Sequence, residues 1–250
     1  MTTLRRLIVP LLLLALWWGT AKWGGIAKIL LPSPEMVWEA FVRMVADGTL
    51  LTHISMSAMR TGTGFLLAAA AGLALGILFA SRPKVRDAFS FLIEALRLTP
   101  PLSLIPLLIL WLGIDEAPKI AIVFLSSFFP MYLNALEAVR GIDPKLVEVA
   151  TLLRFTPKER FRYLTLPAAL PGLLTGLRIG FGYSWRALVG AELIAASSGL
   201  GFLISESAEF GKTDVVFVGI LSIVVLGIAA DALMAKFLNW LLARITGVAA

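Results

Sequence analysis

The chain has 250 residues, of which 59% are hydrophobic and 15% are charged, and its mean hydropathy is +0.90. Soluble domains carry about 25% charged residues, so this composition excludes an ordinary water-soluble globular protein and indicates an integral membrane protein. The net charge of +6 fits basic loops that orient membrane spans better than a nucleic-acid surface, because basic and aromatic residues do not alternate on a polar face.

Six apolar segments approach or exceed the roughly 20 residues that a helix needs to cross a bilayer. In chain order they are residues 7–23, 61–81, 89–112, 119–139, 168–195 and 215–243. Arg5 and Arg6 before the first segment would also suit a secretory signal peptide, but no small-x-small cleavage site follows, so this segment is expected to remain as a span. The sequence therefore predicts an all-α membrane protein with about six transmembrane helices in one domain, residues 1–250.

Local signals refine two of these regions. Between the first two spans, the stretch PSPEMVWEAFVRMV predicts a short amphipathic helix on the outer membrane surface, with Ser33 as its cap and Pro34 at its first position. In the third span, Pro100, Pro101 and Pro106 are expected to break or kink the helix. Broken helices at membrane depth are tolerated where they line a cavity.

The distribution of Lys and Arg predicts the orientation of the spans. With the N-terminus inside the cell, thirteen basic residues lie in inner loops and six in outer ones. The outer six are Lys22, Lys28, Arg43, Arg60, Lys119 and Lys212. Basic residues collect on the cytoplasmic side of membrane proteins, so both termini are predicted to be cytoplasmic, together with the loop of residues 143–166.

This cytoplasmic loop resembles a water-soluble segment in its sequence, VEVATLLRFTPKERFRYLTLP over residues 147–167. Asp143 can cap a helix that begins at Pro144, and Thr156 and Glu159 have capping-box spacing for a second helix. The first helix carries an apolar stripe, the pattern of a buried face, at Leu146, Val149, Ala150 and Leu153. Isolated helices of about ten residues are marginal in water, so this pair must pack on its own domain or on another protein.

The spacing of this loop resembles the EAA motif of permease subunits of binding-protein-dependent ABC importers. That motif reads Glu-Ala-Ala, three residues, Gly, nine residues, Ile-x-Leu-Pro. Here the corresponding positions hold Glu148-Val149-Ala150, then Arg154, then Leu164-Thr165-Leu166-Pro167. Val149 replaces an alanine and Arg154 replaces the glycine of the usual tight turn, so Thr156-Pro157 is an alternative place for the chain to turn.

The resemblance extends over nearly the whole chain from Leu31 onward. The stretches IPLLILWLGIDEAPKI, LPAALPGLLTGLRIGFGYSW and GAELIAASSGLGFLI are similar to permeases of the aliphatic sulfonate, taurine and nitrate branch. The first of these stretches is most similar to aliphatic sulfonate permeases, and nitrate, taurine, bicarbonate or a pyrimidine precursor are alternative substrates.

The resemblance implies a type I ABC importer permease in a bacterial plasma membrane. Its expected partners are a second copy of the chain, a cytoplasmic ABC ATPase dimer, an extracytoplasmic solute-binding protein and membrane lipid, with no nucleic acid. The chain itself would bind no cofactor, because ATP and Mg would reside on the ATPase. The loop would be the coupling helix, which contacts the ATPase through Glu148, Val149, Ala150, Leu153, Arg154, Thr156, Lys158 and Arg160, and the spans would work by alternating access.

Candidate residues of the translocation path lie in the third and fifth spans. Ionisable residues within apolar spans usually face a cavity, water or an opposite charge, and three cationic residues there, Arg97, Arg178 and Arg186, favour an anionic substrate. Glu94, Glu192 and Asp231 could instead pair with them, and the glycines of the fifth span could serve tight packing as well as a path. The residues assigned to the path are Arg186, Arg97, Gly180 and Trp185.

Two other classes of function have less support in the sequence. An ion-gradient-driven secondary transporter often shows inverted repeats with paired broken helices, and no second copy of the fifth-span pattern is evident. An intramembrane enzyme lacks support, because the chain has no Cys, a single histidine (His53) with no assigned role, and no paired carboxylate site. Gly211-Lys212-Thr213 ends like a phosphate loop, but Glu206 stands where that pattern needs glycine, so ATP hydrolysis is expected in another polypeptide.

Overall fold

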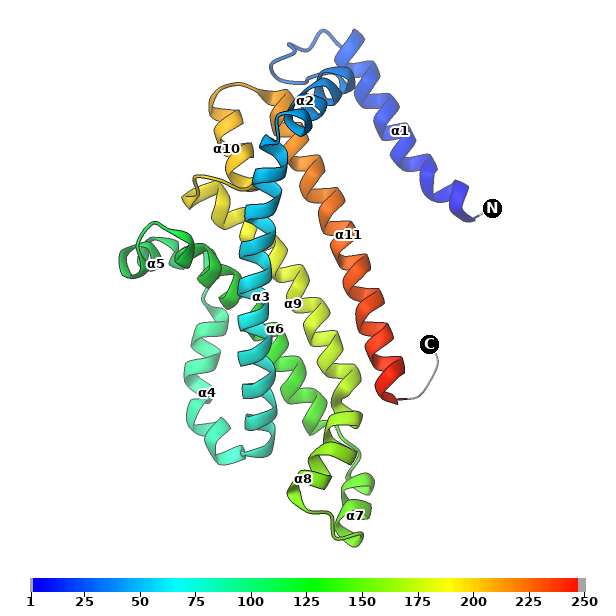
Figure 1. Cartoon of the computed structure of the whole chain (residues 1–250), viewed down its shortest axis with the longest axis vertical. Helices are drawn as coiled ribbons and strands as arrows, with labels where there is room; N and C mark the ends of the chain where they lie inside the picture. The colour runs from blue at the N-terminus through cyan, green and yellow to red at the C-terminus, as the bar shows by residue number, and fades with distance from the viewer. Residues whose placement is uncertain (1, 247–250) are drawn as a thin grey trace. The chain divides into compact units, whose positions relative to one another are not determined.

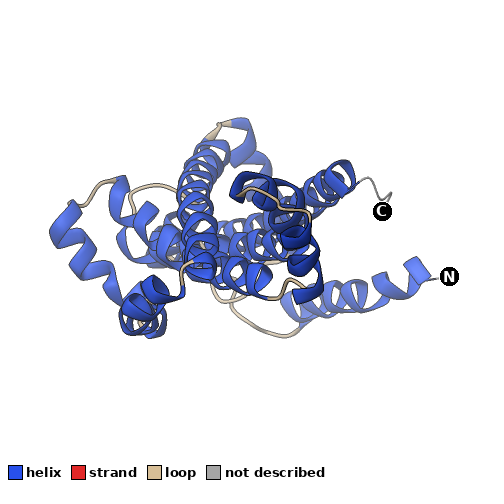
Figure 2. Ribbon diagram, turned by 90° about the horizontal axis from the view of Figure 1, so that it is seen from below, coloured by secondary structure: helices blue, strands red, loops and turns tan. Residues whose placement is uncertain are grey.

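The computed structural model describes residues 2–246, with side chains from 8 to 245 (Figure 1). Within residues 2–246 the regular secondary structure is entirely helical (Figure 2), which confirms the predicted all-α class. The side chains of Arg5 and Arg6, and the C-terminal residues 247–250, lie outside this described part.

The helices follow one another with short connections. They are α1 (Thr2–Trp23), α2 (Pro34–Ala46), α3 (Thr49–Ser81), α4 (Pro83–Leu98), the 3-10 turn η1 (Pro101–Leu104), α5 (Ile105–Leu112), α6 (Glu116–Arg140), α7 (Pro144–Leu152), α8 (Pro157–Arg160), the π turn η2 (Phe161–Thr165), α9 (Leu166–Ala195), α10 (Leu200–Glu209) and α11 (Thr213–Thr246). They form two compact units, one of residues 1–57 and 192–225 and the other of residues 58–191 and 226–250. The long helices α3, α9 and α11 contribute residues to both units.

Four of the described helices are long and apolar enough to cross a membrane: α3, α6, α11, and α9 with the turns that lead into it. The pair formed by α4 and the segment Pro101–Leu112 passes the same test together, as a fifth candidate. The predicted first span corresponds to α1, whose described apolar part, Ile8–Trp23, is shorter than these. Its crossing of the bilayer therefore stays a prediction.

The third predicted span, residues 89–112, is two helices that meet at 89° rather than one kinked helix. The chain leaves the helical conformation at Thr99 and Pro100, whose ψ angles are 120° and 122°. A residue that precedes proline is pushed out of the helical region, and here two such residues stand in succession. The predicted break at Pro100-Pro101 is thus confirmed. Pro106 causes no kink, because it lies in the first turn of α5, where a missing N–H is harmless.

Two basic residues that the sequence predicts in outer loops are buried inside helices. Arg60 belongs to α3, which begins at Thr49 rather than near residue 61, and its side chain is completely buried. Lys119 lies in the first turns of α6 and is only 3% exposed. The other four predicted outer basic residues, Lys22, Lys28, Arg43 and Lys212, are not buried, so the charge bias behind the predicted orientation is kept.

The unit of residues 1–57 and 192–225 contains the predicted surface helix. As expected, Ser33 caps α2 by accepting a hydrogen bond from the Met36 N–H, and hydrogen bonds from Ser33 and Trp18 lower the pKa of Glu35 to about 2. One face of α2 is buried in this unit through Val37, Ala40 and Met44. The α1 side chain of Trp17 donates to the Pro32 carbonyl at 3.0 Å and stacks on Phe217 of α11.

In the other unit, small residues of α3 bring this helix close to α6. Gly64, Ala68, Gly72 and Gly76 recur every four residues, so they lie on one face of α3. A Cβ added at Gly64 would lie 2.6 Å from Val123, and one added at Gly76 would lie 2.6 Å from the Ala135 Cβ. Both distances are far below a normal contact. Glycine at these positions therefore sets the separation of the two helices.

A second row of glycines packs α9 against α6. Added Cβ atoms at Gly172, Gly176 and Gly180 would lie 2.5, 2.7 and 2.5 Å from Ala138, Asn134 and Met131, respectively. The glycine spacing of the fifth predicted span thus serves close helix packing. Helix α6 is held between two helices with smooth, glycine-rich faces.

Replacing Gly76 with alanine should destabilise the protein, because the new methyl group would meet Ala135 and the Tyr132 carbonyl oxygen, at 2.6 and 2.7 Å. Overpacking of this kind costs about 1–3 kcal/mol. Gly62→Ala is the matched control on the same helix, since an added Cβ there meets no atom within 4 Å and alanine is favoured in helices by about 1 kcal/mol. Thermal unfolding in detergent micelles should show a lower midpoint for Gly76→Ala only. Equal midpoints for the two variants would contradict the close packing.

Candidate functional site

The loop of residues 143–166, which is predicted to be cytoplasmic, begins with α7, which forms as the sequence predicts. The Asp143 side chain accepts a hydrogen bond from the Lys145 N–H at 2.9 Å, and Pro144 occupies the first position. The apolar stripe differs from the prediction of a buried face, because only Ala150 is buried by this chain. Leu146, Val149 and Leu153 are 47%, 51% and 63% exposed. The stripe therefore remains uncovered by its own polypeptide.

The chain turns sharply at Arg154, at the motif's glycine position. Arg154 has φ 52°, and no other described residue except glycine has a positive φ. Its N–H donates to the Thr151 carbonyl, and the Phe155 N–H donates to the Ala150 carbonyl, both at 3.0 Å. These two bonds form the Schellman motif that ends many helices. The turn thus stays where the motif has glycine, and Arg154 adopts a left-handed conformation that costs an L-residue about 1–2 kcal/mol.

The second helix of the loop starts with the predicted capping box. The Thr156 N–H donates to the Glu159 carboxylate at 2.8 Å, and the Glu159 N–H donates to the Thr156 hydroxyl at 3.3 Å. This reciprocal pair satisfies backbone donors that a helix start would otherwise leave unpaired.

The second helix does not end before the fifth span, because the chain runs from Pro157 to Ala195 without a break. One π turn, η2, joins α8 to α9, with the Leu166 N–H donating to the Phe161 carbonyl. Pro167 has no N–H to donate to the preceding turn, which disfavours the regular α-helical ladder here. We call the segment from Asp143 to Thr165 the elbow.

The remaining coupling residues line the outside of the elbow. Glu148, Arg154, Thr156, Lys158 and Arg160 are all exposed. The rings of Phe155 and Tyr163 contact each other across the turn, with centroids 6.3 Å apart. The structure therefore brings every predicted coupling residue onto one compact, capped segment at the ends of α6 and α9 (Figure 1).

The four residues assigned to a translocation path have different surroundings. Arg97 forms an ion pair with Glu94 on the same helix, α4. Gly180 packs on Met131, and Trp185 packs on α11, where its Nε1 would lie 2.9 Å from a Cβ at Gly227. Arg186 is exposed. Its Nε donates to the Gly182 carbonyl at 2.9 Å and its guanidinium lies 5.1 Å from the Tyr183 ring centroid.

The expected ion pairs are partly confirmed. Arg178 of α9 pairs with Asp231 of α11 at 2.8 Å, and Arg97 pairs with Glu94 as described. Arg186 forms no ion pair with a carboxylate among residues 8–245. Of Arg97, Arg178 and Arg186, it is therefore Arg186 whose charge is not paired by the described residues and is available to bind an anion.

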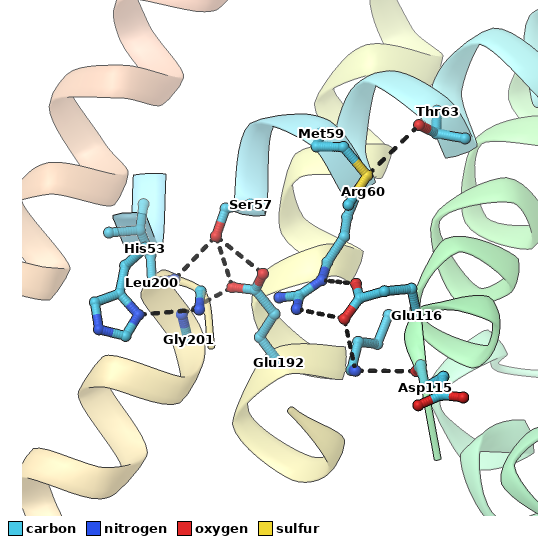
Figure 3. Close-up of polar contacts among 12 residues, drawn as sticks. His53, Ser57, Met59, Arg60, Thr63, Asp115, Glu116, Glu192, Leu200 and Gly201 are labelled. Atoms are coloured by element: carbon cyan, nitrogen blue, oxygen red, sulfur yellow. Dashed lines mark hydrogen bonds and ion pairs between the residues drawn. The ribbon is translucent and has the colours of Figure 1, made fainter. Parts of the chain in front are cut away.

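A buried polar cluster that the sequence did not predict holds the start of α10 (Figure 3). The Leu200 N–H donates to the Ser57 hydroxyl at 2.9 Å, the Gly201 N–H donates to the Glu192 carboxylate at 3.0 Å, and Ser57 in turn donates to Glu192. The Gly199 N–H donates to His53 Nδ1 at 3.0 Å. His53, which the sequence left without a role, thus fixes a helix start. Glu192, an expected partner of an arginine, also caps this helix.

A second buried cluster surrounds Arg60 (Figure 3). Its Nε and Nη2 both donate to the Glu116 carboxylate, the latter at 2.9 Å, and Lys119 donates to Glu116 and to the Asp115 carbonyl. The Arg60 side chain is completely buried whereas that of Glu116 is 37% exposed, so this ion pair fixes the position of a charge that has been removed from water. One sequence signal was available: His53, Ser57, Arg60 and Gly64 recur at intervals of three or four residues, as one face of α3.

Comparison with known proteins supplies independent information. A family model described as "Binding-protein-dependent transport system inner membrane component" matches residues 72–241, which include the elbow. The putative aliphatic sulfonates transport permease protein SsuC of Bacillus subtilis is 36% identical over 241 residues, which cover 95% of this chain and 87% of the relative. The taurine transport system permease protein TauC of Escherichia coli is 35% identical, with 91% of this chain and 86% of the relative covered.

Solved structures show the same fold. The inward-facing MetNI methionine ABC transporter has a chain that superposes with a TM-score of 0.66 at 20% identity. The match covers 86% of this chain and 99% of the other. The fold is therefore the type I ABC importer permease fold.

Replacing Arg154 with glycine should stabilise the elbow, because glycine adopts the left-handed conformation without the steric cost that arginine bears. A gain of about 1 kcal/mol corresponds to a roughly fivefold smaller equilibrium constant for local opening of the turn. Hydrogen exchange of the Phe155 amide, which closes the turn, should slow by this factor. Arg154→Ala is the control, since it removes the charge and keeps the strain. Slower exchange in both variants would assign the effect to the side chain instead of the backbone.

Proposed function

Because the chain belongs to the family of binding-protein-dependent transport system inner membrane components, we propose that it forms the translocation path for a small anion, of the aliphatic sulfonate class, and couples this path to ATP hydrolysis by alternating access. The chain is the permease subunit of an ABC importer, integral to the inner membrane, and it is not an enzyme. ATP is hydrolysed by the partner ATPase. We propose that the permease itself binds no cofactor.

The observation that carries the coupling role is the uncovered apolar stripe of the elbow. Leu146, Val149 and Leu153 are about half exposed or more, and the charge bias predicts that their loop is cytoplasmic, where lipid would not cover them. Contiguous exposed apolar residues with a polar rim mark protein interfaces. The rim here consists of Glu148, Arg154, Lys158 and Arg160. The proposed occupant of this surface is the ABC ATPase.

The elbow is built to transmit force as a rigid lever. Its first helix is capped at one end by Asp143 and closed at the other by the Schellman turn at Arg154. Its second helix continues without a break into α9. A push on α7 therefore reaches α6 through a three-residue connection and α9 through a continuous helix. Closure of the ATPase dimer would move two such elbows together and switch the spans between inward-open and outward-open states.

The substrate proposal rests on charge and on the relatives. Arg186 supplies a guanidinium whose described contacts are a backbone carbonyl and an aromatic ring, so its charge is available to bind an anion. The relatives include permeases named for aliphatic sulfonates and for taurine. Another, the nitrate import permease NrtB of Leptolyngbya laminosa, is 29% identical over 83% of this chain. Taurine and nitrate therefore remain alternative substrates. Bicarbonate and a pyrimidine precursor are further alternatives that none of these relatives supports.

The proposal includes an assembly and an orientation. The permease would act as a homodimer, because a type I fold presents one elbow per chain to an ATPase dimer. A solute-binding protein would deliver the substrate at the outer side, and both termini would be cytoplasmic. No observation in the described residues favours the alternative of an ion-gradient-driven transporter, which would need no ATPase.

The elbow is tested by giving its apolar stripe a charge. Val149→Asp should weaken association with the cognate ATPase at least tenfold in a pull-down, because it would bury an unpaired carboxylate at the interface. The side chain is exposed in the free permease, so folding should not change. Thr151→Asp is the matched control, since an aspartate there adds the same charge to the exposed, opposite side of α7. Undiminished binding by Val149→Asp would remove the docking role.

Transport is tested in proteoliposomes that contain the permease, its ATPase and its solute-binding protein. Uptake of a labelled alkanesulfonate should require ATP, and Arg186→Ala should lower it about tenfold or more while leaving membrane expression unchanged. Arg186→Lys should retain part of the uptake because it keeps the charge. Uptake that follows a proton gradient without ATP would favour the secondary transporter. Normal uptake by Arg186→Ala would take this residue out of the path.

A further inference from the structure

An apolar groove lies between α4 and the pair formed by α3 and α6. It has a volume of about 400 Å³, and all of its lining residues are apolar. Helix α3 contributes Leu78 and Phe79, α4 contributes Phe89 and Leu92 among others, and α6 contributes Phe128. The rings of Phe79 and Phe89, with centroids 5.8 Å apart, connect α3 and α4 within this lining.

The groove opens to the surroundings of the protein. Leu78, Phe89 and Leu92 are 44%, 47% and 52% exposed, although no polar atom lines the space. In water such a surface would be unfavourable, but α3 crosses the hydrocarbon core of the membrane, where apolar surface is expected to meet lipid. The groove is therefore expected to be a concave part of the lipid-facing surface.

The length of the groove matches one leaflet. On α4 its lining runs from Val85 to Leu96, which corresponds to about 16 Å at a rise of 1.5 Å per residue. The hydrocarbon core of a bilayer is about 30 Å thick, so one leaflet contributes roughly 15 Å. A single extended acyl chain has this length and this polarity.

One end of the groove is cationic. Val85, the first lining residue of α4, is flanked by Lys84 and Arg86, and Arg82 precedes the helix as its N-terminal cap. Arg86 pairs with Asp87 at 2.8 Å. Arg82 and Lys84 are exposed and form no ion pair with any residue from 8 to 245. The turn between α3 and α4 therefore offers two cations beside the end of the groove.

We propose that this groove binds one acyl chain of an anionic phospholipid, whose headgroup phosphate is held by Arg82 and Lys84. The apolar lining selects a hydrocarbon chain, and the basic turn selects a negative headgroup, since each cation near a membrane surface attracts anionic lipid. A second copy of the chain is a poorer occupant. If it placed its own α4 in the groove, it would bring a second cationic turn against the first.

The proposal is tested with the full-length permease in phosphatidylcholine nanodiscs that contain a trace of photoactivatable lipid. Two probes carry the same diazirine on the acyl chain, one with a phosphatidylglycerol headgroup and one with phosphatidylcholine. Illumination and peptide mass spectrometry should place the cross-links on groove residues such as Phe89 and Leu92. Labelling by the anionic probe should exceed labelling by the zwitterionic one about thirtyfold, as two lipid-attracting cations predict.

Variants separate the headgroup from the acyl chain. The double variant Arg82→Gln/Lys84→Gln should reduce anionic labelling to the zwitterionic level, while Arg140→Gln/Lys145→Gln, an equal charge change on the same predicted side, should leave it unchanged. Leu92→Trp should fill the groove and reduce labelling by both probes. Unchanged elution from a size-exclusion column shows that a variant is folded. If Leu92→Trp does not fold, the test still rests on the variants of the exposed residues Arg82 and Lys84.

Several outcomes would overturn the proposal. Equal labelling by the two probes, or cross-links spread evenly over the exposed apolar surfaces of α1 and α11, would indicate ordinary contact with bulk lipid. Groove residues cross-linked to a second permease chain would identify that chain as the occupant. Transport activity need not change in any of these experiments, so the result is independent of the proposed function.

Discussion

The structure depends above all on the close approach of α6 to its two neighbours in the unit of residues 58–191 and 226–250. Within a bilayer the hydrophobic effect no longer drives helices together, so association relies on van der Waals contact and on polar bonds. Glycine rows on α3 and α9 provide that contact, and Met131 of α6 lies against both, near Gly72 on one side and Gly180 on the other. The helix that leads into the elbow and the helix that leaves it are therefore two of these three closely packed helices.

Polar groups also hold the helices together. Arg60 of α3 and Glu116 of α6 are joined by a two-pronged ion pair near the start of α6, and Lys119 contributes a third member. In the unit of residues 1–57 and 192–225, Ser57, His53 and Glu192 satisfy the first amides of α10. In a low-dielectric environment an unsatisfied donor is costly, so these groups specify one arrangement of their helices as well as stabilise it.

The sequence predicted best the features that are set by neighbouring residues. Caps at Asp143 and at Thr156 with Glu159 involve partners two or three residues away, and the break at Pro100-Pro101 follows from local sterics. The turn at Arg154 is local as well, but the preference of arginine for negative φ angles argued against it. Two Schellman hydrogen bonds hold Arg154 in a conformation that is usually adopted by glycine.

Long-range partners could not be predicted in the same way. Glu116, which forms an ion pair with Arg60, lies 56 positions away in the sequence. Gly199, whose amide donates a hydrogen bond to His53, lies 146 positions away. From the sequence Arg60 was an outer-loop charge and His53 a residue without a role, because charge and composition do not reveal which helices meet. The exposure of the elbow's stripe was also beyond the sequence, since an amphipathic pattern shows that a face must be covered and does not show by which polypeptide.

The composition of α4 has a consequence for how the protein is made. One side of this helix bears Asp87, Ser90, Glu94 and Arg97, so α4 alone would partition poorly from the translocon into lipid. Helix α3, by contrast, is uncharged from Thr61 to Ser81 and is synthesised immediately before it. Only Arg82 separates the two helices, so they would be expected to enter the bilayer together as a helical hairpin. The apolar surface of the helix made first would then offset the cost of inserting the charged helix made second.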